Sequence, residues 1–417
     1  MKRRDFLYTV SGALAAALST SELYAYIQRH IQNAPPETNF DVIVLGVGSM
    51  GASACYYLAK RGYRVLGIEQ FDIPHEYGSH AGQSRVIRKA YGEGSGYVPL
   101  LERAYQNWKT LESETGSQVY YKTGLLYFAE PDDAFLKSVI SSSQKYNIPI
   151  DFLTEAECSQ KYPQFKLPKH FQRLFEHDAG FITPEKSILL LVEQALRKGA
   201  VIRTREKAIE WKREKGIITL TTNKGNYQAK KLIITAGSWT SKLIPVLSSK
   251  LTVTRQAIAW VKTKTWEDFT LGTFPCWLLK NKDYGFYGFP ILPSGNFGGP
   301  LGMKLALHYP GEIIDPDTGN RTAPDSDEKI LVDFLNEFIP NGYERTLTVK
   351  TCLYTNSPDT NFIIDYLNGF DKDVAFAAGF SGHGFKFVSV IGEILADLVI
   401  NGTTSLPIEF LSAKRFG

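Results

Sequence analysis

The segment over 41–69 constrains the fold more than any other part of this chain. It begins with a short continuous apolar run, Asp41-Val-Ile-Val-Leu45, which is typical of a strand buried on both faces. Gly46-Val-Gly48-Ser-Met-Gly51 follows and opens a helical stretch over 52–61. A GxGxxG motif is common by chance, but this one lies between a strand and a helix, and an acid, Glu69, follows its first glycine by 23 positions. The context predicts a βαβ unit that binds a dinucleotide.

Each part of this motif has a physical role in holding a dinucleotide. The first glycine permits a tight turn, the second lets a pyrophosphate approach the backbone, and the third lets the helix pack closely on the strand. The helix N-terminus supplies N–H donors and a partial positive charge. A carboxylate at position 69 can hold two ribose hydroxyls and would repel a 2′-phosphate. The cofactor residues predicted from this segment are Gly46, Gly48, Ser49, Met50, Gly51 and Glu69.

The remaining pattern divides into two kinds of segment. Buried strands and amphipathic helices like those of a doubly wound sheet are expected at 64–68, 184–199, 211–222, 225–229, 231–237, 374–380 and 388–400. Between them, residues 250–310 are dominated by strand-forming residues with glycine-rich turns, and a helix with a polar start is expected over 325–339. These intervening segments predict a mostly antiparallel sheet in a second domain.

The N-terminus has the anatomy of an export signal. Lys2-Arg3-Arg4-Asp5-Phe6-Leu7 precedes an uncharged, alanine-rich stretch over 8–18. Two adjacent arginines followed by x-Phe-Leu resemble the twin-arginine signal, whose machinery carries folded proteins. We expect a signal over 1–25, a polar spacer over 26–38, and a periplasmic or otherwise exported protein. A non-cleaved amphipathic helix is the alternative, and two fair cleavage sites leave the point of cleavage open.

Composition and spacing exclude several other classes of protein. The chain of 417 residues has 47 Lys+Arg and 43 Asp+Glu, and a net charge of +4 is no signature of nucleic-acid binding. Its four cysteines make neither a disulfide framework nor a zinc pair, and no apolar run is long enough to span a bilayer. His75-Glu76-x-x-x-His80 is one residue too long for a zinc helix, and no GxxxxGK[ST] sequence occurs. We therefore expect no metal, no nucleic-acid partner and no stable membrane insertion.

Four further segments carry a family resemblance. They are residues 78–94, residues 304–308, Thr351-Cys-Leu-Tyr-Thr355 and Gly379-Phe-Ser-Gly-His-Gly-Phe-Lys386. With them, the chain from about 40 to 411 resembles the monomeric sarcosine oxidase and N-methyltryptophan oxidase family of FAD-dependent amine oxidases. We expect an α/β fold in which a Rossmann-type FAD-binding domain is interleaved with a mostly antiparallel-sheet substrate domain, in a monomer. The expected boundaries are 39–120, 184–245 and 346–417 for the FAD-binding domain, and 121–183 and 246–345 for the substrate domain.

The resemblance also implies a reaction and a covalent cofactor. The family oxidises the C–N bond of N-methylated or cyclic amino acids, transfers a hydride to the flavin, and passes the electrons to oxygen. Its FAD is held by a cysteine thioether, and the matching residue is Cys352. Lys304 matches the cation that promotes the reaction with oxygen, and Arg85 is expected nearer the flavin ring. Further expected cofactor contacts are Ser79, Ala236, Gly237, Gly382, His383, Gly384 and Lys386.

The substrate residues follow from the same resemblance. An amino-acid carboxylate needs cationic, preferably bidentate, partners, and Arg88 and Lys386 would supply them. Tyr287 and Tyr354 would line the cavity with π-rich walls, and His308 would support the flavin face or the amine. Plainer interpretations stay open for each residue: a structural arginine, an exposed lysine, a core histidine or aromatic residue, or a buried thiol.

Two residues depart from the family pattern. Relatives usually carry a second histidine where this chain has Ala81, and often an acid where it has Gln83. The first of these positions lies near the flavin in relatives, so the potential or the rate of the flavin can differ in this chain.

Two other classes of function compete with an oxidase. One is a flavin-dependent amino-acid dehydrogenase that delivers electrons to a membrane quinone, and Lys304 argues against it. The other is a non-catalytic flavin-binding module, which the set of Arg88, Lys386 and Cys352 argues against. The identity of the amine does not follow from these residues, because the volume of the cavity decides it.

Overall fold

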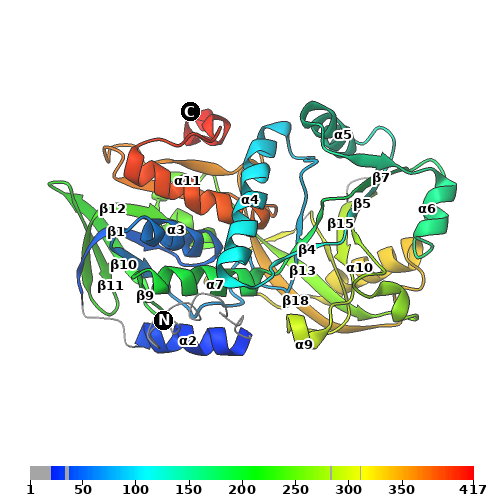
Figure 1. Ribbon diagram of the computed structural model, residues 1–417, viewed down its shortest axis with the longest axis horizontal. Helices are drawn as coiled ribbons and strands as arrows, with labels where there is room; N and C mark the ends of the chain where they lie inside the picture. The colour runs from blue at the N-terminus through cyan, green and yellow to red at the C-terminus, as the bar shows by residue number, and fades with distance from the viewer. Residues whose placement is uncertain (1–19, 33–36, 282–283, 310) are drawn as a thin grey trace, which may run out of the picture.

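A mainly parallel sheet forms one half of the computed structural model, which describes residues 20–32, 37–281, 284–309 and 311–417 (Figure 1). Its strands are Asn39–Leu45 (β1), Val65–Ile68 (β2), Val201–Arg203 (β9), Ala208–Glu214 (β10), Ile217–Thr222 (β11), Asn226–Ile234 (β12), Ile363–Tyr366 (β19) and Val374–Ala378 (β20). β9, β2, β1 and β12 lie parallel in that order. Beyond β12 the sheet forks, because one half of this strand pairs with the antiparallel hairpin β10–β11 and the other with parallel β20, which β19 flanks.

Helices cover this sheet in a stack. They are Ser49–Lys60 (α3), Val98–Thr115 (α4), Pro184–Arg197 (α7) and Val388–Asn401 (α11). α3 lies between α11 and α7, and it is buried from Met50 to Ala59 because it has neighbours on every side (Figure 1). The predicted βαβ unit and Rossmann-type α/β fold are confirmed, and the helix that follows the glycine motif begins at Ser49 rather than at position 52.

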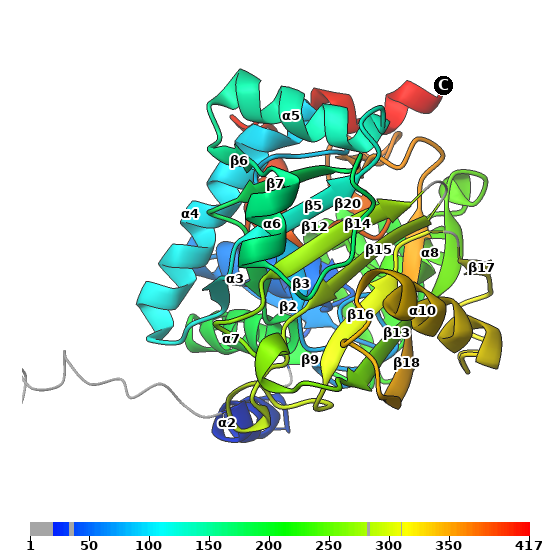
Figure 2. The same ribbon diagram turned by 90° about the vertical axis from the view of Figure 1, so that its right-hand side faces the viewer.

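An antiparallel sheet forms the other half of the molecule (Figure 2). Its strands are Leu125–Ala129 (β5), Ile150–Phe152 (β6), Gln172–Glu176 (β7), Thr252–Lys262 (β13), Cys276–Asn281 (β14), Tyr284–Phe289 (β15), Met303–Leu307 (β16), Glu312–Ile313 (β17) and Arg345–Asn356 (β18). Their order is β17-β13-β16-β15-β14-β5-β7-β6, with β18 also paired to β13, and only the β5–β14 pair is parallel. The prediction of a mostly antiparallel sheet is therefore confirmed.

The two faces of the antiparallel sheet serve different cores. Met303 and Leu305 pack with Leu331 and Phe334 of the helix Asp325–Phe338 (α10), on the face away from the parallel sheet. Side chains at alternate positions, such as Ala306, join the core shared with the parallel half. Alternation therefore turns one set of side chains toward the cofactor-binding half. The expected site residues of this set are Tyr287, Lys304, His308, Cys352 and Tyr354.

Pairing between strands links residues on both sides of two expected domain boundaries. β18 pairs with β13 along its whole length, so residues 346–356 belong to the antiparallel sheet and not to the FAD-binding part. A small antiparallel sheet joins Arg85–Ile87 (β3), Tyr120–Lys122 (β4) and Gly180–Ile182 (β8), and it crosses the expected boundary at residue 120. The remaining helices are Ala134–Tyr146 (α5), Glu155–Lys161 (α6), Thr240–Leu243 (α8) and Ser294–Phe297 (α9).

The helix Thr20–Gln32 (α2) packs against α7 at the edge of the molecule (Figure 1). Its Leu23 and Ile27 are buried in the main core. Residues 1–19 of the expected export signal lie outside the described part. The last residues of that expected signal and the first of the expected spacer form this docked helix. None of the helices in the described ranges is both long enough and apolar enough to cross a membrane.

Candidate active site

A cavity of about 380 Å³ lies between the two halves and collects most of the predicted site residues. Those that line it are Gly46, Gly48, Ser49, Met50, Glu69, Ser79, Arg85, Arg88, Ala236, Gly237, Tyr287, His308, Tyr354, Gly382, His383, Gly384 and Lys386. Gly51, Lys304 and Cys352 are not among the residues that line it. Residues far apart in the sequence thus meet in one place, with the glycine motif at one end and the aromatic residues at the other.

The glycine motif has the geometry that a pyrophosphate site needs. Gly46 has a φ of +92°, and a Cβ there would lie 2.7 Å from the carbonyl oxygen of Thr235. A Cβ on Gly51 would lie 1.9 Å from the carbonyl oxygen of Gly46, so only glycine lets α3 approach this turn. Gly48 faces open space, where a pyrophosphate can approach the backbone.

Glu69 stands at the end of β2 with both carboxylate oxygens in use by the backbone. It accepts N–H bonds from Val47 and Phe71, each at 3.0 Å. Burial raises the pKa of Glu69 to about 7, and these two bonds oppose that shift. Each oxygen keeps a further lone pair, so the carboxyl group can also hold ribose hydroxyls.

FAD fits these residues. The ring of His80 is buried, its Nε2 has no hydrogen-bond partner, and the residue lines the cavity. A bound polar group would satisfy this atom. Gly237 has a φ of +54° and no atom within 4 Å of the place where a Cβ would lie, so its backbone is open to a ligand. The orphaned nitrogen and the two open glycines fit an extended cofactor.

Arg85 and Lys304 form a cationic pair against the loop over 79–84. The guanidinium of Arg85 donates to the carbonyls of Ser79, Ala81 and Ser84 at 2.5–3.0 Å. Lys304 is 1% exposed, and its Nζ donates to the carbonyls of Gly82 and Ser84 at 2.5 and 2.6 Å. Burial lowers the pKa of Lys304 well below its usual value, and repulsion from Arg85 adds to the shift. Four carbonyl oxygens hold these two cations, with that of Ser84 shared between them, and the nearby carboxylate of Glu185 acts to raise the pKa of both.

Cys352 lies beside the same two cations. Its side chain is buried on β18, and burial raises the pKa of the thiol, while Arg85 and Lys304 oppose that shift. Positive neighbours favour the thiolate, which is the nucleophilic form of cysteine. Burial outweighs the two cations, so the thiol form of Cys352 is favoured, although both cations act toward the thiolate.

Arg88 makes a bidentate ion pair with Glu93, a residue that the sequence analysis did not single out. Its Nη2 lies 2.7 and 2.6 Å from the two carboxylate oxygens of Glu93, and the guanidinium stacks over the rings of Tyr91 and Phe135. Burial alone would raise the pKa of Glu93, but Arg88 and the cations beyond it lower it to about 2. Glu93 sits inside a segment quoted for the family resemblance, yet nothing in its spacing marks it as a partner of Arg88.

Lys386 faces the same charge cluster from the short turn over 385–387 that precedes α11. Its Nζ donates to the carbonyl of His383 at 2.7 Å and lies 3.5 Å from the hydroxyl of Tyr91. Burial lowers the pKa of Lys386 to about 7, and repulsion from Arg88 contributes to the shift. Nearby Glu93 opposes it. The site therefore contains one lysine whose charge can change near neutral pH.

Aromatic side chains form a neighbouring part of the cavity wall. The ring nitrogen Nδ1 of His308 lies 3.3 Å from the hydroxyl of Tyr354, and the rings of Tyr287 and His308 meet edge to face. Burial lowers the pKa of His308 to about 3, so this ring is neutral at physiological pH. A Cβ on Gly382 would lie 2.2 Å from the ring of Tyr354, which explains the glycine at that position.

The loop over 379–384, which we call the glycine loop, carries His383 into the cavity wall. The Nε2 of His383 lies 3.0 Å from the carbonyl of Thr360, and its Nδ1 lies 2.7 Å from the hydroxyl of Tyr91. Because a carbonyl only accepts, Nε2 carries the proton and Nδ1 accepts from the tyrosine. Burial lowers the pKa of His383 to about 4, so the ring stays neutral.

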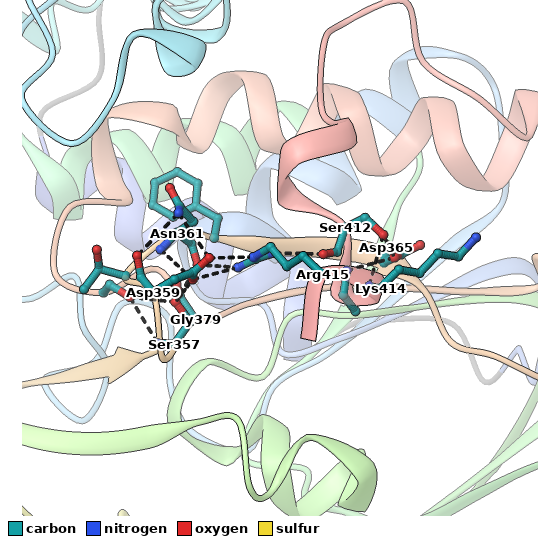
Figure 3. Close-up of polar contacts among 12 residues, drawn as sticks. Ser357, Asp359, Asn361, Asp365, Gly379, Ser412, Lys414 and Arg415 are labelled. Carbon is teal, nitrogen blue, oxygen red and sulfur yellow. Dashed lines mark hydrogen bonds and ion pairs between the residues drawn. The ribbon is translucent and has the colours of Figure 1, made fainter. Parts of the chain in front are cut away.

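The glycine loop is held from behind by a polar cluster that reaches the C-terminal segment (Figure 3). Arg415 donates to the two carboxylate oxygens of Asp359 at 2.8 and 3.1 Å and to the carbonyl of Asn361 at 3.0 Å. Ser357 donates its hydroxyl to the same carbonyl and its N–H to the hydroxyl of Ser381. Residues near the C-terminus thus support a loop that lines the active-site cavity.

Comparisons with known proteins agree with this site. The family described as FAD dependent oxidoreductase matches residues 41–398. Monomeric sarcosine oxidase of Bacillus sp. (strain B-0618) is 37% identical over 383 residues, covering 91% of this chain and 96% of that protein. N-methyl-L-tryptophan oxidase of Salmonella dublin is 33% identical over 381 residues, covering 90% and 99%.

Among solved structures, the open form of NikD, an unusual amino acid oxidase essential for nikkomycin biosynthesis, superposes with a TM-score of 0.79. It covers 90% of this chain and 98% of its own at 23% identity, which supports the fold. The family match spans most of the chain, and the two sequence relatives exceed 30% identity over nearly their whole length. The chain therefore belongs to the FAD-dependent oxidoreductase family and is an enzyme related to monomeric sarcosine oxidase and N-methyl-L-tryptophan oxidase.

Proposed function

We propose that the protein is an oxidase of N-methyl or other secondary amino acids, with FAD attached through Cys352 and oxygen reduced to hydrogen peroxide. The arrangement that supports this most directly is a pair of cations at each of two places in one site. Arg88 and Lys386 stand beside the aromatic wall, and Arg85 and Lys304 stand beside Cys352. The first pair suits an amino-acid carboxylate, and the second suits negative charge that develops during the reaction.

The carboxylate of the substrate would bind between Arg88 and Lys386. Because Glu93 already engages Arg88, the incoming carboxylate must compete with Glu93 for the guanidinium or share it. A bound anion also raises the pKa of Lys386 and so favours its protonated form. Substrate binding would thus replace or share the carboxylate of Glu93 at Arg88, and it would favour uptake of a proton by Lys386.

The amine end of the substrate would lie against the aromatic wall. The π faces of Tyr287 and Tyr354 attract an ammonium group, and neutral His308 adds no opposing charge. This wall can therefore hold the amine in either protonation state while the carboxylate is fixed at the other end.

The overall reaction balances without any further reactant than oxygen and water. FAD, when bound, accepts two electrons from the substrate and supplies them to oxygen. The substrate loses a hydride from carbon and a proton from nitrogen and becomes an imine, which water hydrolyses to a carbonyl compound and an amine. Oxygen gains two electrons and two protons. Lys304 and Arg85 would stabilise the negative charge that oxygen acquires, because both cations are already in place.

The proposed activity is tested with a panel of N-methyl, cyclic and primary amino acids, measuring hydrogen peroxide and substrate loss together. We expect one peroxide for each secondary amino acid consumed. Substrate-dependent reduction of a quinone analogue without peroxide would instead identify a dehydrogenase, the competing function.

Covalent attachment is tested separately. Acid-precipitated protein should keep its yellow colour in the pellet, and Cys352→Ala should release the flavin into the supernatant, whereas Cys276→Ala, another buried thiol, should not. Colour in the wild-type supernatant would contradict the attachment.

We also propose export by the twin-arginine route, which Arg3 and Arg4 support. FAD is inserted in the cytoplasm, and a route for folded proteins accepts a loaded enzyme. Changing both arginines to lysine should trap the protein inside the cell. Export of that variant, or retention of the wild type, would contradict the proposal.

A further inference from the structure

The connection between β9 and β10 lines the active-site cavity beside Glu69. Residues 206–209 of this connection are all part of the cavity wall. The N–H of Glu206 donates to the main-chain carbonyl of Glu69 at 2.9 Å, so the two segments run next to each other past the end of β2. A group attached to a ribose that Glu69 holds would therefore meet this connection.

Glu206 is a buried glutamate with only one of its two oxygens in use. Its side chain is 2% exposed, and the hydroxyls of Thr222 on β11 and Tyr227 on β12 donate to its Oε1 at 2.6 and 2.8 Å. No described residue donates a hydrogen bond to the other oxygen, Oε2. Because buried polar atoms are normally bonded, this carboxylate is held in a fixed orientation with one acceptor left for a ligand.

The order of groups in FAD determines which of them comes to this place. In a dinucleotide site of this kind the helix N-terminus holds the pyrophosphate and the acid after β2 holds the adenosine ribose, so the adenine base lies beyond Glu69. The flat faces of adenine suit the apolar side chains of Ala208, Ile209 and Leu243, which line the same cavity. The exocyclic amino group of adenine has N–H donors, and a carboxylate only accepts.

We infer that Glu206 recognises the adenine base of FAD by accepting a hydrogen bond from its amino group at Oε2. A purine with a carbonyl oxygen at that position would place one acceptor against another, so Glu206 selects adenine against hypoxanthine. Glu69 does not make this distinction, because both dinucleotides carry the same ribose. The inference goes beyond the proposed oxidase function and depends on neither the amine nor the electron acceptor.

The experiment measures cofactor binding without turnover. Cys352→Ala protein freed of FAD is titrated with FAD and with an FAD analogue that carries hypoxanthine in place of adenine, and the quenching of flavin fluorescence gives each Kd. We expect FAD to bind about ten- to a hundredfold more tightly, the usual range for one hydrogen bond to a charged group. If Cys352 does not attach the flavin, wild-type protein stripped of FAD takes its place in the same titration.

Glu206→Gln should reverse this preference. Thr222 and Tyr227 would still donate to the oxygen at the Oε1 position, which leaves the amide NH2 of the glutamine facing the base. A donor there repels the amino group of adenine and bonds the carbonyl oxygen of hypoxanthine, so the analogue should become the tighter ligand. The matched control is Glu210→Gln, the same substitution at an exposed position of β10, which should keep the wild-type ratio.

The ratio of two affinities on one protein is insensitive to a general loss of stability. Equal affinity of the unsubstituted site for both dinucleotides, or an unchanged ratio in Glu206→Gln, would refute the inference. If the glutamine variant does not fold, an FAD analogue with hydrogen in place of the amino group is the second probe, and binding as tight as that of FAD would also refute it. Absence of peroxide in the loaded wild type would refute the oxidase and leave this inference standing.

Discussion

Two arginine–lysine pairs serve this site, and they differ in what holds them. Arg85 and Arg88 stand three residues apart on and just after β3, but their side chains have different partners. Arg85 and Lys304 donate to the carbonyls of one loop. Arg88 is bound by a carboxylate, Glu93, and shares its surroundings with Lys386. In the proposed oxidase, the first pair is held in place by the backbone, and the second is where the substrate carboxylate would bind.

The difference indicates how one small site can run two half-reactions. Charge that appears only during a reaction is stabilised best by cations that need not move, because no reorganisation is then required. A substrate that must enter and leave is held best by cations whose partner can be exchanged. Substitutions in the two pairs should therefore affect different half-reactions.

Lys304→Met should give the largest effect. Reoxidation by oxygen should slow by about 10²–10³, the usual loss when one preorganised charge is removed, while anaerobic reduction stays within a few-fold of normal. Stopped-flow absorbance of the flavin measures both rates. An unchanged reoxidation rate would show that Lys304 does not stabilise the negative charge that oxygen acquires.

Arg88→Ala should give the second largest effect, a loss of affinity for the substrate. Loss of a charge-assisted pair in a partly desolvated site costs about 2–4 kcal/mol, or roughly 30- to 1000-fold in binding. The loss should appear for N-methyl amino acids and be much smaller for the matching amines without a carboxylate. Lys89→Ala, a neighbouring cation that pairs with Asp178, is the control. Equal losses for both ligand types would show that Arg88 does not hold the carboxylate.

The pH dependence of carboxylate binding should reveal Lys386. Its pKa of about 7 means that it is protonated, and attracts an anion, below pH 7 and becomes neutral above it. Affinity for acetate should therefore fall by up to about tenfold per pH unit above 7. Glu93 stays ionised and His308 and His383 stay neutral over this pH range, so they do not contribute to the pH dependence of the affinity for acetate. Lys386→Met should flatten the profile, and an unchanged slope would assign it to another group.

The polar cluster behind the glycine loop should give the smallest effect. Arg415 and Asp359 are partly exposed, so a substitution that breaks their ion pair should cost only about 0.5–1 kcal/mol and lower Tm by about 1 °C. Both half-reactions should keep their rates, because His383 retains its bond to Thr360. Lys414→Ala is the matched control, since its ammonium points away from the cluster in Figure 3. A change in reoxidation rate would mean that this support also sets the active-site geometry.

The cofactor-binding half was predicted well because its signals are local. A strand, three glycines and an acid lie within one short segment, and each glycine has a steric reason that a single position can show. The alternation that turns Lys304 and His308 toward the same half is equally local. Both predictions depend only on residues that lie a few positions apart in the sequence.

The parts that were missed depend on pairing across the chain. β18 joins β13 through a register that no nearby residue reveals, so the expected boundary at 346 falls inside a strand of the antiparallel sheet. α2 packs against α7 through Leu23 and Ile27, although its composition suggested a leader and a spacer. Glu93 was recognised as a site residue only in the structure, where its carboxylate pairs with Arg88. Contacts between residues that lie far from each other in the sequence, or that meet only after folding, determine all three features.

The most direct test of the central claim uses the wild-type enzyme with no substitution. The flavin is first reduced without air by an N-methyl amino acid and then mixed, in separate shots, with oxygen or with a soluble quinone analogue. The account predicts rapid reoxidation by oxygen with one hydrogen peroxide formed per flavin. Slow reoxidation in air together with rapid reoxidation by the quinone would contradict it and identify a dehydrogenase.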